Sequence, residues 1–333
     1  MKPIAVVTGG AGFIGSHMVD LLIKQGFYVN IIDSFIGGSK KNLKHLENNS
    51  RIKVWDEDIR DLKSDHEAFN HVDYVFHFAG IGDIVPSISK PIDYLDVNVL
   101  GTSRVLECSR IAKVKKFVYA ASSSCYGLAA VPTDECHKIE PMYPYALSKY
   151  QGEQAAFHWY RVYGLPVNSI CIFNAYGPRV KTNGAYGAVF GVFLKQFLEH
   201  KPLTLVGDGT QKRDFIYVTD VARAFLEAAK TPENGQRYNV GAGNPQTIKY
   251  LIELIGGEYI NLPKRGGEPE ITYANINKIK NKLNWEPVVS FEEGVSKMLS
   301  NIKDWKDAPL WDVKKIEEAT KVWFQYMDVG NKK

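Results

Sequence analysis

A glycine-rich turn near the amino terminus constrains the fold of this chain more than any other feature. The apolar stretch Ile4 to Thr8 reads as a buried strand, and the run from Gly9 to Gly15 (GGAGFIG) follows it directly, ahead of a helical pattern. The run satisfies both the GxGxxG and the GxxGxxG spacing. A missing Cβ at Gly12 lets a pyrophosphate approach the backbone, and Gly15 permits close packing of helix on strand. Because the amino terminus of a helix attracts anions, the sequence predicts a dinucleotide-binding turn.

An acidic residue at the end of the next strand indicates which dinucleotide binds. Asp33 closes the expected strand Tyr28 to Asp33 and lies 18 residues beyond Gly15. A carboxylate at this place hydrogen-bonds the ribose hydroxyls of NAD and repels the 2′-phosphate of NADP. NAD is therefore the expected cofactor, although Lys40 and Lys41 nearby leave NADP open.

Short apolar stretches alternate with amphipathic ones through the first half of the chain. The expected strands are Ile4 to Thr8, Tyr28 to Asp33, Ile52 to Trp55, Tyr74 to Phe78, Lys116 to Ala121 and Val167 to Phe173. The expected helices are Ile14 to Gln25, Ile92 to Ala112 and Tyr145 to Tyr163. Strands that are apolar throughout are typical of a parallel sheet covered on both faces. The sequence thus predicts an α/β fold with a doubly wound parallel Rossmann sheet.

Loops rich in Gly, Asn and Pro after Phe173 indicate a smaller, mixed α/β C-terminal domain at the carboxyl ends of the strands. We expect the NAD-binding Rossmann domain to span 1–175, with 211–243 returning to it, because Phe215 to Ala229 reads as a further strand and helix. Residues 176–210 and 244–333 then form the smaller substrate domain, which ends in a helical tail.

The tail has a helical pattern of its own. Asp312 is expected to cap the amino terminus of a helix. Beyond it, apolar side chains recur at helical spacing at Ile316, Ala319, Trp323 and Tyr326 or Met327. Such a stripe favours a helix packed against the body of the protein, while a lid or a partner contact stays open.

Composition limits the class of protein. Apolar residues make up 45% of the 333 residues and charged residues 23%, as in soluble globular chains. The net charge of +4 does not suggest nucleic-acid binding, and no apolar run reaches the roughly 18 residues that cross a bilayer. The cysteines have no CxxC spacing, so reduced thiols, no metal site and a cytoplasmic location are expected.

A serine, a tyrosine and a lysine form a candidate proton-transfer set. Tyr145 and Lys149 are four residues apart on one expected helix, so that they share a face. The strand Lys116 to Ala121 ends just before Ser122, and its carboxyl end faces the same crevice as that helix. A tyrosine pKa of about 10 is too high for a base at pH 7, but two cations, Lys149 and oxidised nicotinamide, favour the phenolate.

With these motifs the chain resembles the extended short-chain dehydrogenase/reductase family, and within it the nucleotide-sugar epimerases and dehydratases. The resemblance spans roughly residues 4 to 300, in the family's order. Further matching blocks are Asp58 to Asp61 (DIRD), His77 to Gly80 (HFAG), Asn98 to Thr102 (NVLGT), Phe173 to Arg179 (FNAYGPR), Gly207 to Phe215 (GDGTQKRDF) and Tyr238 to Gly241 (YNVG).

The resemblance implies a role for each matching position. Tyr145 would be the catalytic base, Ser122 would bond the sugar 4-hydroxyl, and Lys149 would hold the nicotinamide ribose. The implied NAD-binding residues are Gly9, Gly12, Phe13, Ile14, Asp33, Ser34, Asp58, Ile59, Phe78, Ala79, Gly80, Asn98, Tyr145, Lys149 and Phe173. The implied nucleotide-sugar-binding residues are Ser123, Ser124, Asn174, Val189, Arg213, Arg265 and Glu268.

The residues after Ser122 distinguish the reactions of this family. Dehydratases resemble one another in an Asp-Glu pair there, and uronate decarboxylases in a Ser-Glu version, whereas this chain has Ser123 and Ser124. Without a carboxylic acid, the resemblance implies redox at sugar carbon 4 and hence 4-epimerisation of a nucleotide sugar, with NAD regenerated at each turn. A 4-ketoreductase, a dehydratase with another acid/base pair and a non-catalytic nucleotide-sensing protein stay open.

The resemblance also implies the partners of the chain. The substrate would be a UDP-hexose, either UDP-glucose and UDP-galactose or their N-acetyl forms, which a small gate residue such as Thr272 could admit. Uronate-handling relatives carry an Arg in the loop after the fourth strand, where this chain has Val85 and the negatively charged Asp83, so a uronic acid is disfavoured. A homodimer is expected through the helices Ile92 to Ala112 and Tyr145 to Tyr163.

Overall fold

Seven parallel strands form the central sheet of the protein, whose computed structural model describes residues 2–182, 189–264 and 268–327. The strands are β1 (Ile4–Thr8), β2 (Tyr28–Asp33), β3 (Ile52–Asp56), β4 (Tyr74–His77), β5 (Lys116–Ser122), β6 (Val167–Ile172) and β11 (Gln236–Val240). Their order is β11-β6-β5-β4-β1-β2-β3, the doubly wound topology predicted from the sequence. The strand order reverses between β1 and β4, so a crevice opens at the carboxyl ends of these strands.

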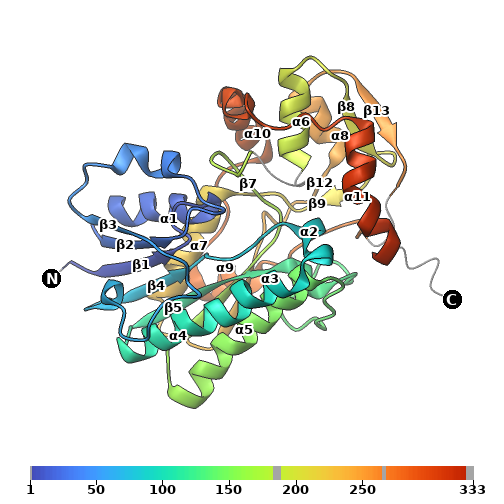
Figure 1. The fold of residues 1–333 in the computed structure, drawn as a ribbon. Coiled ribbons are helices and arrows are strands. Elements are labelled where there is room, and N and C mark those ends of the chain that lie inside the picture. Colours follow the sequence, from blue (N-terminus) through green and yellow to red (C-terminus); the bar gives the residue numbers. More distant parts are fainter. Residues whose placement is uncertain (1, 183–188, 265–267, 328–333) are drawn as a thin grey trace.

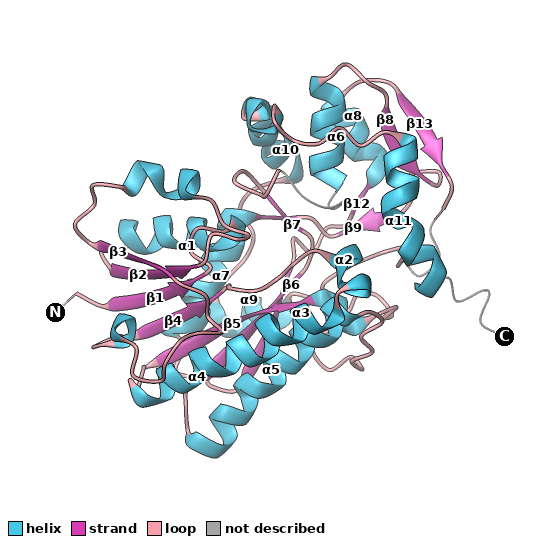
Figure 2. Cartoon of the chain, in the orientation of Figure 1, coloured by secondary structure: helices cyan, strands magenta, loops and turns pink. Residues whose placement is uncertain are grey.

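Helices cover both faces of the sheet (Figure 2). One face carries α3 (Pro91–Leu95), α4 (Thr102–Ile111) and α5 (Pro144–Tyr163), and the other carries α1 (Phe13–Lys24) and α7 (Val218–Lys230). Every residue of β5 is buried, which explains why this strand is apolar along nearly its whole length. The expected strands agree with the observed ones to within one residue at each end.

The helical pattern over 92–112 is interrupted in the structure. A π-helical segment, Asp96–Gly101, separates α3 from α4. This segment brings the Asn98 side chain beneath the loop that follows β4, where it bonds the backbone of Ile81. Short 3-10 turns lie elsewhere, at Lys40–Leu46, Glu67–Phe69, Ser123–Tyr126 and Ile302–Trp305. The single long helix predicted for this stretch is therefore corrected to two helices joined by a wider turn.

A smaller unit lies beside the sheet and has its own core, in which aliphatic side chains surround a cluster of aromatic ones (Figure 1). Its helices are α6 (Val189–Leu198), α8 (Ile248–Ile255) and α10 (Phe291–Ser300). Its short strand pairs are β7 (Ala175–Tyr176) with β10 (Ile216–Tyr217), β9 (Lys212–Arg213) with β12 (Gln246–Thr247), and β8 (Leu203–Val206) with β13 (Tyr259–Leu262). The remaining helices are α2 (Ile84–Ser89), α9 (Asn277–Leu283), which packs on β11, and α11 (Val313–Met327).

The segment that returns to the large sheet differs in detail from its prediction. The strand expected at Phe215 is the two-residue β10, which pairs with β7 outside the seven-stranded sheet. The helix that follows it, α7, does pack on β5 and β6. The strand that joins the large sheet is β11, which pairs with β6 at the edge.

The tail forms the predicted helix. Asp312 accepts a hydrogen bond from the backbone N–H of Lys315 at 2.9 Å and so caps the amino terminus of α11. The buried face of α11 consists of Ile316, Thr320, Trp323 and Met327. Across residues 2–182, 189–264 and 268–327, no helix combines the length and the apolar character needed to span a bilayer.

Candidate active site

The glycine-rich turn joins β1 to α1 at the carboxyl edge of the sheet. A Cβ on Gly15 would lie 2.1 Å from the carbonyl oxygen of Gly9, so only glycine permits this close packing of helix on turn. Among the described residues, no side chain caps the amino terminus of α1, which begins after Gly12. Phe13 and Ile14 in its first turn stay partly exposed. The N–H groups of this turn can therefore bind an anion such as a pyrophosphate.

Asp33 ends β2 beside this turn. Its carboxylate accepts hydrogen bonds from the N–H groups of Ala11 and Phe35, both at 2.8 Å. Burial raises the pKa of Asp33, and the two N–H donors oppose the rise. The carboxylate is thus held at the end of the strand, next to the partly exposed Ser34, where the ribose hydroxyls of a dinucleotide would meet it.

A buried histidine ties the turn to the neighbouring loops. His77 Nδ1 lies 2.7 Å from Thr8 Oγ1, and His77 Nε2 lies 2.8 Å from Thr102 Oγ1. Thr102 donates its proton to the carbonyl oxygen of Asn98, so it accepts from Nε2, and Thr8 donates to Nδ1. Burial lowers the pKa of His77 to about 3, so the ring is neutral near pH 7 and this chain of bonds is maintained.

Lys149 lies on α5 with its ammonium group beside the loop that follows β4. Its Nζ lies 4.7 Å from the centre of the Tyr119 ring and 4.0 Å from where a Cβ on Gly80 would lie. No hydrogen-bond acceptor for Nζ occurs within residues 2–182, 189–264 and 268–327. Burial lowers the pKa of Lys149 to about 8, while the Glu153 carboxylate opposes the shift. An ammonium group in this position suits a hydroxyl of the nicotinamide ribose, so the residues present fit NAD.

Ser122 and Tyr145 meet where β5 and α5 converge. Ser122 is the last residue of β5, and Tyr145 lies in the first turn of α5. Burial raises the pKa of Tyr145, and a hydrogen bond between the two hydroxyl groups opposes that rise. Tyr145 still keeps some solvent exposure, so it does not lie in the closed core. The structure therefore brings Ser122 and Tyr145 into contact, and Lys149 lies one turn farther along α5, over the Tyr119 ring.

The loop after β4 is fixed from below. Phe78 packs on the ring of Phe225 with ring centres 4.4 Å apart, and Ala79 and Gly80 follow at the surface of the cleft. The Asn98 amide bonds both backbone groups of Ile81 and the Ser148 hydroxyl. Asn98 thus has its side chain engaged by the protein, and it positions the loop that the sequence assigned to the cofactor.

Three other residues assigned to NAD lie deeper or are paired. Ile59 and Phe173 are both 4% exposed and belong to the core. Asp58 forms an ion pair with Arg60 at 2.8 Å, and this contact lowers the Asp58 pKa. These three residues can therefore contact a cofactor through their backbone groups near the strand ends, but they have no free polar side-chain group for it.

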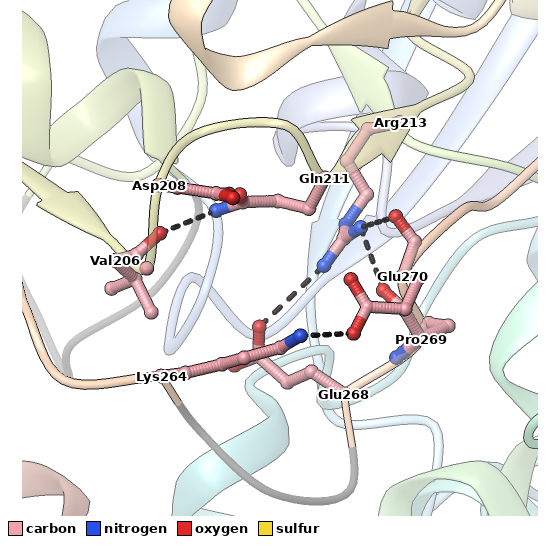
Figure 3. A pocket seen from close by; sticks show the side chains of 9 residues that line it. Val206, Asp208, Gln211, Arg213, Lys264, Glu268, Pro269 and Glu270 are labelled. Atoms are coloured by element: carbon pink, nitrogen blue, oxygen red, sulfur yellow. Dashed lines mark hydrogen bonds and ion pairs between the residues drawn. The ribbon is translucent and has the colours of Figure 1, made fainter.

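A charged pocket lies in the smaller unit. It is shown in Figure 3 and is lined by Val206, Gly207, Asp208, Gln211, Arg213, Lys264, Glu268, Pro269 and Glu270. Its central guanidinium, Arg213, reaches Glu268 at 3.5 Å and the carbonyl oxygen of Pro269 at 2.9 Å. Burial lowers the pKa of Arg213, and the two nearby glutamates oppose the shift. Arg213 and Glu268 are thus brought together as predicted, whereas Arg265 lies outside the described residues.

The other residues assigned to the nucleotide sugar come from three different segments. Asn174 follows β6, and its Oδ1 accepts a hydrogen bond from Thr272 Oγ1 at 2.7 Å. Val189 begins α6 and is partly exposed. Ser123 and Ser124 are partly exposed in the turn after β5, and the Ser124 hydroxyl is bonded to the Tyr143 hydroxyl.

Sequence reasoning missed Tyr143 and the hydrogen bonds of His77. The single local signal for Tyr143 was its position, two residues before Tyr145 and at the start of a helix. His77 stands inside the matching block His77 to Gly80, but nothing in the sequence shows that its two nitrogens meet Thr8 and Thr102. The two hydrogen bonds of His77 join residues that are far apart in the chain.

Comparisons with known proteins agree with this geometry. A family model described as the NAD dependent epimerase/dehydratase family matches residues 5–241. A putative UDP-glucose 4-epimerase of Methanocaldococcus jannaschii is 36% identical over 90% of this chain and 98% of its own length.

Two solved structures are similar over nearly their full length. A UDP-N-acetylglucosamine 4-epimerase from Methanobrevibacter ruminantium M1, in complex with UDP-N-acetylmuramic acid, has a TM-score of 0.85 at 31% identity, covering 92% of this chain and 99% of that one. A UDP-glucuronic acid 4-epimerase from Bacillus cereus, in complex with UDP-glucuronic acid and NAD, has a TM-score of 0.84 at 32% identity, covering 90% and 99%. With its dinucleotide turn and its Ser-Tyr-Lys cleft, this chain belongs to the NAD dependent epimerase/dehydratase family.

Proposed function

We propose that this protein is an NAD-dependent nucleotide-sugar 4-epimerase that acts on a UDP-hexose. The observation that carries the proposal is the hydrogen bond between Ser122 and Tyr145, with Lys149 one turn farther along α5. The two residues after Ser122 are serines and not carboxylic acids. Elimination of water needs an acid beside the sugar, and the hydroxyl groups of Ser123 and Ser124 cannot supply one. The relatives named as 4-epimerases support the same reaction.

The residues of the cleft account for the proton steps. Bound NAD would supply the hydride acceptor and donor for sugar carbon 4. Tyr145 takes the proton of the 4-hydroxyl and later returns a proton to the oxygen on the other face of the sugar, while Ser122 hydrogen-bonds that oxygen. The positive charge of Lys149 would lower the pKa of Tyr145, because a nearby cation favours the phenolate over the neutral phenol.

We assign the two parts of the molecule to the two ligands. Residues 1–175 with 211–243 would hold NAD, and 176–210 with 244–333 would hold the nucleotide sugar. The ion pair between Arg213 and Glu268 joins the two ranges. Arg213 and Asn174 suit a diphosphate, because guanidinium and amide groups donate hydrogen bonds to its oxygens. We also infer a cytoplasmic location, which the four free cysteines support.

The experiment that tests the function follows the sugar itself. Purified protein is expected to carry NAD and to interconvert UDP-glucose and UDP-galactose, or their N-acetyl forms, with no added reductant. Sugar-nucleotide NMR distinguishes the alternatives: loss of water to a 6-deoxy-4-keto sugar would show a dehydratase. Stoichiometric consumption of reduced nicotinamide would show a reductase.

The lowered pKa of Lys149 predicts how turnover depends on pH. Its pKa of about 8 means that the ammonium group loses its proton as the pH rises past 8. Tyr145 then loses the cation that favours its phenolate, so kcat at saturating substrate is expected to fall above pH 8. A kcat profile from about pH 6 to pH 10 measures this. A rate that stays constant to the alkaline end would contradict it.

Lys116 provides a matched control for this profile. Burial also lowers its pKa to about 8, but it lies at the opposite end of β5 and bonds the backbone of Thr231 and Glu233. Lys116→Arg keeps a charge there at all relevant pH values. The alkaline decrease should therefore persist in this variant.

An apolar surface along α3, α4 and α5 supports the proposed homodimer. Its exposed side chains are Ile92, Leu100, Ile111, Leu147, Val162 and Tyr163. Leu100 lies in the π-helical segment and is 58% exposed. Because burying an aspartate in a dimer interface is costly, Leu100→Asp should convert dimers to monomers. Sedimentation measures this, and Val288→Asp, on a 65% exposed residue of another surface, should remain a dimer. A wild-type monomer at micromolar concentration would refute the dimer.

A further inference from the structure

The last helix links the smaller unit to the large one. Two hydrogen bonds anchor the segment before α11 to α6 of the smaller unit: Lys195 Nζ donates to the carbonyl oxygen of Lys306, and Gln196 Nε2 to that of Trp311, both at 2.7 Å. Farther along, α11 packs against α2 of the large unit. Figure 1 shows α11 running down to the side of α2. The helix and the segment before it therefore contact both units.

Trp323 is the residue of α11 that reaches the active-site cleft. It is 5% exposed, and its ring centre lies 5.6 Å from that of Tyr143, at an interplanar angle of 53°. The neighbouring Phe324 is 38% exposed and lies outside the buried face of the helix. The contact is thus specific to the inward face of α11.

Tyr143 connects Trp323 to the proton-transfer residues. Its ring is nearly parallel to that of Tyr145, at an interplanar angle of 9° with the ring centres 6.5 Å apart. Its hydroxyl is bonded to Ser124, which adjoins the turn after Ser122. One aromatic row therefore leads from the C-terminal helix to the proposed catalytic base.

Tyr143 also lies near the charged pocket of the smaller unit. Burial raises its pKa to about 12, and the Glu268 carboxylate contributes to the rise. Tyr143 in turn lies close enough to Arg213 to oppose the lowering of the Arg213 pKa. Tyr143 is therefore situated between the proton-transfer end, at Tyr145, and the end assigned to the nucleotide, at Arg213 and Glu268. That intermediate position is where the hexose of a nucleotide sugar would lie.

The chemistry of this row suits a neutral sugar. Tyr143 is partly exposed although Trp323 packs against its ring. An aromatic face packs well against the C–H groups of a pyranose, and the hydroxyls of Tyr143 and Ser124 can hydrogen-bond its oxygens. None of these three side chains carries a charge at pH 7.

We propose that Tyr143 forms the hexose-facing wall of the cleft and that Trp323, a positioning residue on α11, holds it there. The inference rests on the proposed function and assigns to the C-terminal helix a part in recognising the sugar. α11 lies beyond residues 5–241, which the family model matches, so the residue that holds Tyr143 in place comes from a segment outside the matched region.

The test separates the sugar from the nucleotide. Calorimetric titrations with UDP and with UDP-glucose are made on NAD-carrying wild type, Trp323→Ala and the matched control Phe324→Ala. We expect Trp323→Ala to weaken UDP-glucose binding about tenfold and to leave UDP binding unchanged, because only the hexose contacts Tyr143. Phe324→Ala should match wild type for both ligands. Equal weakening of both ligands, or of neither, would overturn the proposal.

A second pair of variants keeps the test decisive if Trp323→Ala does not fold. Tyr143→Phe keeps the ring and should retain most of the UDP-glucose affinity, whereas Tyr143→Ala should lose about as much as Trp323→Ala. Equal affinities for these two variants would also refute the wall. A wild-type protein that binds UDP-glucose no better than UDP, or does not turn it over, would instead count against the proposed function.

Discussion

Replacing Tyr145 by phenylalanine is expected to lower kcat by more than about 100-fold, the usual scale for loss of an acid/base group. The substitution removes one oxygen and leaves the ring, so its packing against Tyr143 and Tyr94 is retained. What is lost is the hydroxyl that is bonded to Ser122 and that would accept the proton of the sugar hydroxyl. Steady-state rates with UDP-glucose and UDP-galactose measure the effect in both directions.

The same helix offers a control for this substitution. Tyr163 is 53% exposed at the far end of α5, so Tyr163→Phe removes an equivalent hydroxyl away from the cleft and should leave kcat unchanged. Tyr145→Phe should still carry NAD, which would show that the loss lies in the chemistry. Near-normal turnover by Tyr145→Phe would reject Tyr145 as the base.

Replacing Gly12 by alanine is expected to weaken NAD binding by about 100-fold or more while the protein still folds. Within the protein, a Cβ at this position would meet one neighbouring atom, the carbonyl oxygen of Gly9, at 3.1 Å. The remaining space around that Cβ is where a pyrophosphate would approach the amino terminus of α1. The NAD content of the purified variant measures the loss, and thermal unfolding should show a stability cost of about 1 kcal/mol or less.

Substitutions at two other glycines serve as controls for Gly12→Ala. Gly37 has no neighbour within 4 Å of an added Cβ, so Gly37→Ala should keep both NAD and stability. Gly15→Ala would place a Cβ 2.1 Å from a backbone oxygen, so it should lose stability as well as NAD. If Gly12→Ala retained its NAD, the turn would not be the pyrophosphate site.

The large sheet could be predicted because its strands are buried on both faces. Ile4–Thr8 and Tyr28–Asp33 were predicted with their observed ends, since a run of apolar residues stops where the strand leaves the core. The two-residue strands of the smaller unit could not be predicted, because two residues are too short to show an alternation. The π-helical segment 96–101 was missed because its residues continue a helical pattern.

The candidate site was predictable where its residues stand in local motifs. The glycine turn, Asp33 and the spacing of Tyr145 and Lys149 are each visible within a few residues of sequence. By contrast, the contact between Tyr143 and Trp323 joins positions 180 residues apart, and only the packing of α11 on α2 brings them together. No periodicity within either segment carries that information.

The order in which the chain builds its sheet has a consequence for synthesis. β11 covers the edge of β6 only after the polypeptide has passed through β8 and α7. Until then, the backbone groups of Val167–Ile172 that face β11 have no partner, and an unpaired strand edge invites pairing with another chain. A nascent chain stalled on the ribosome, or one clipped by a protease, before Gln236 would therefore be prone to aggregate. The edge of β6 is covered only once the chain has been made as far as Val240.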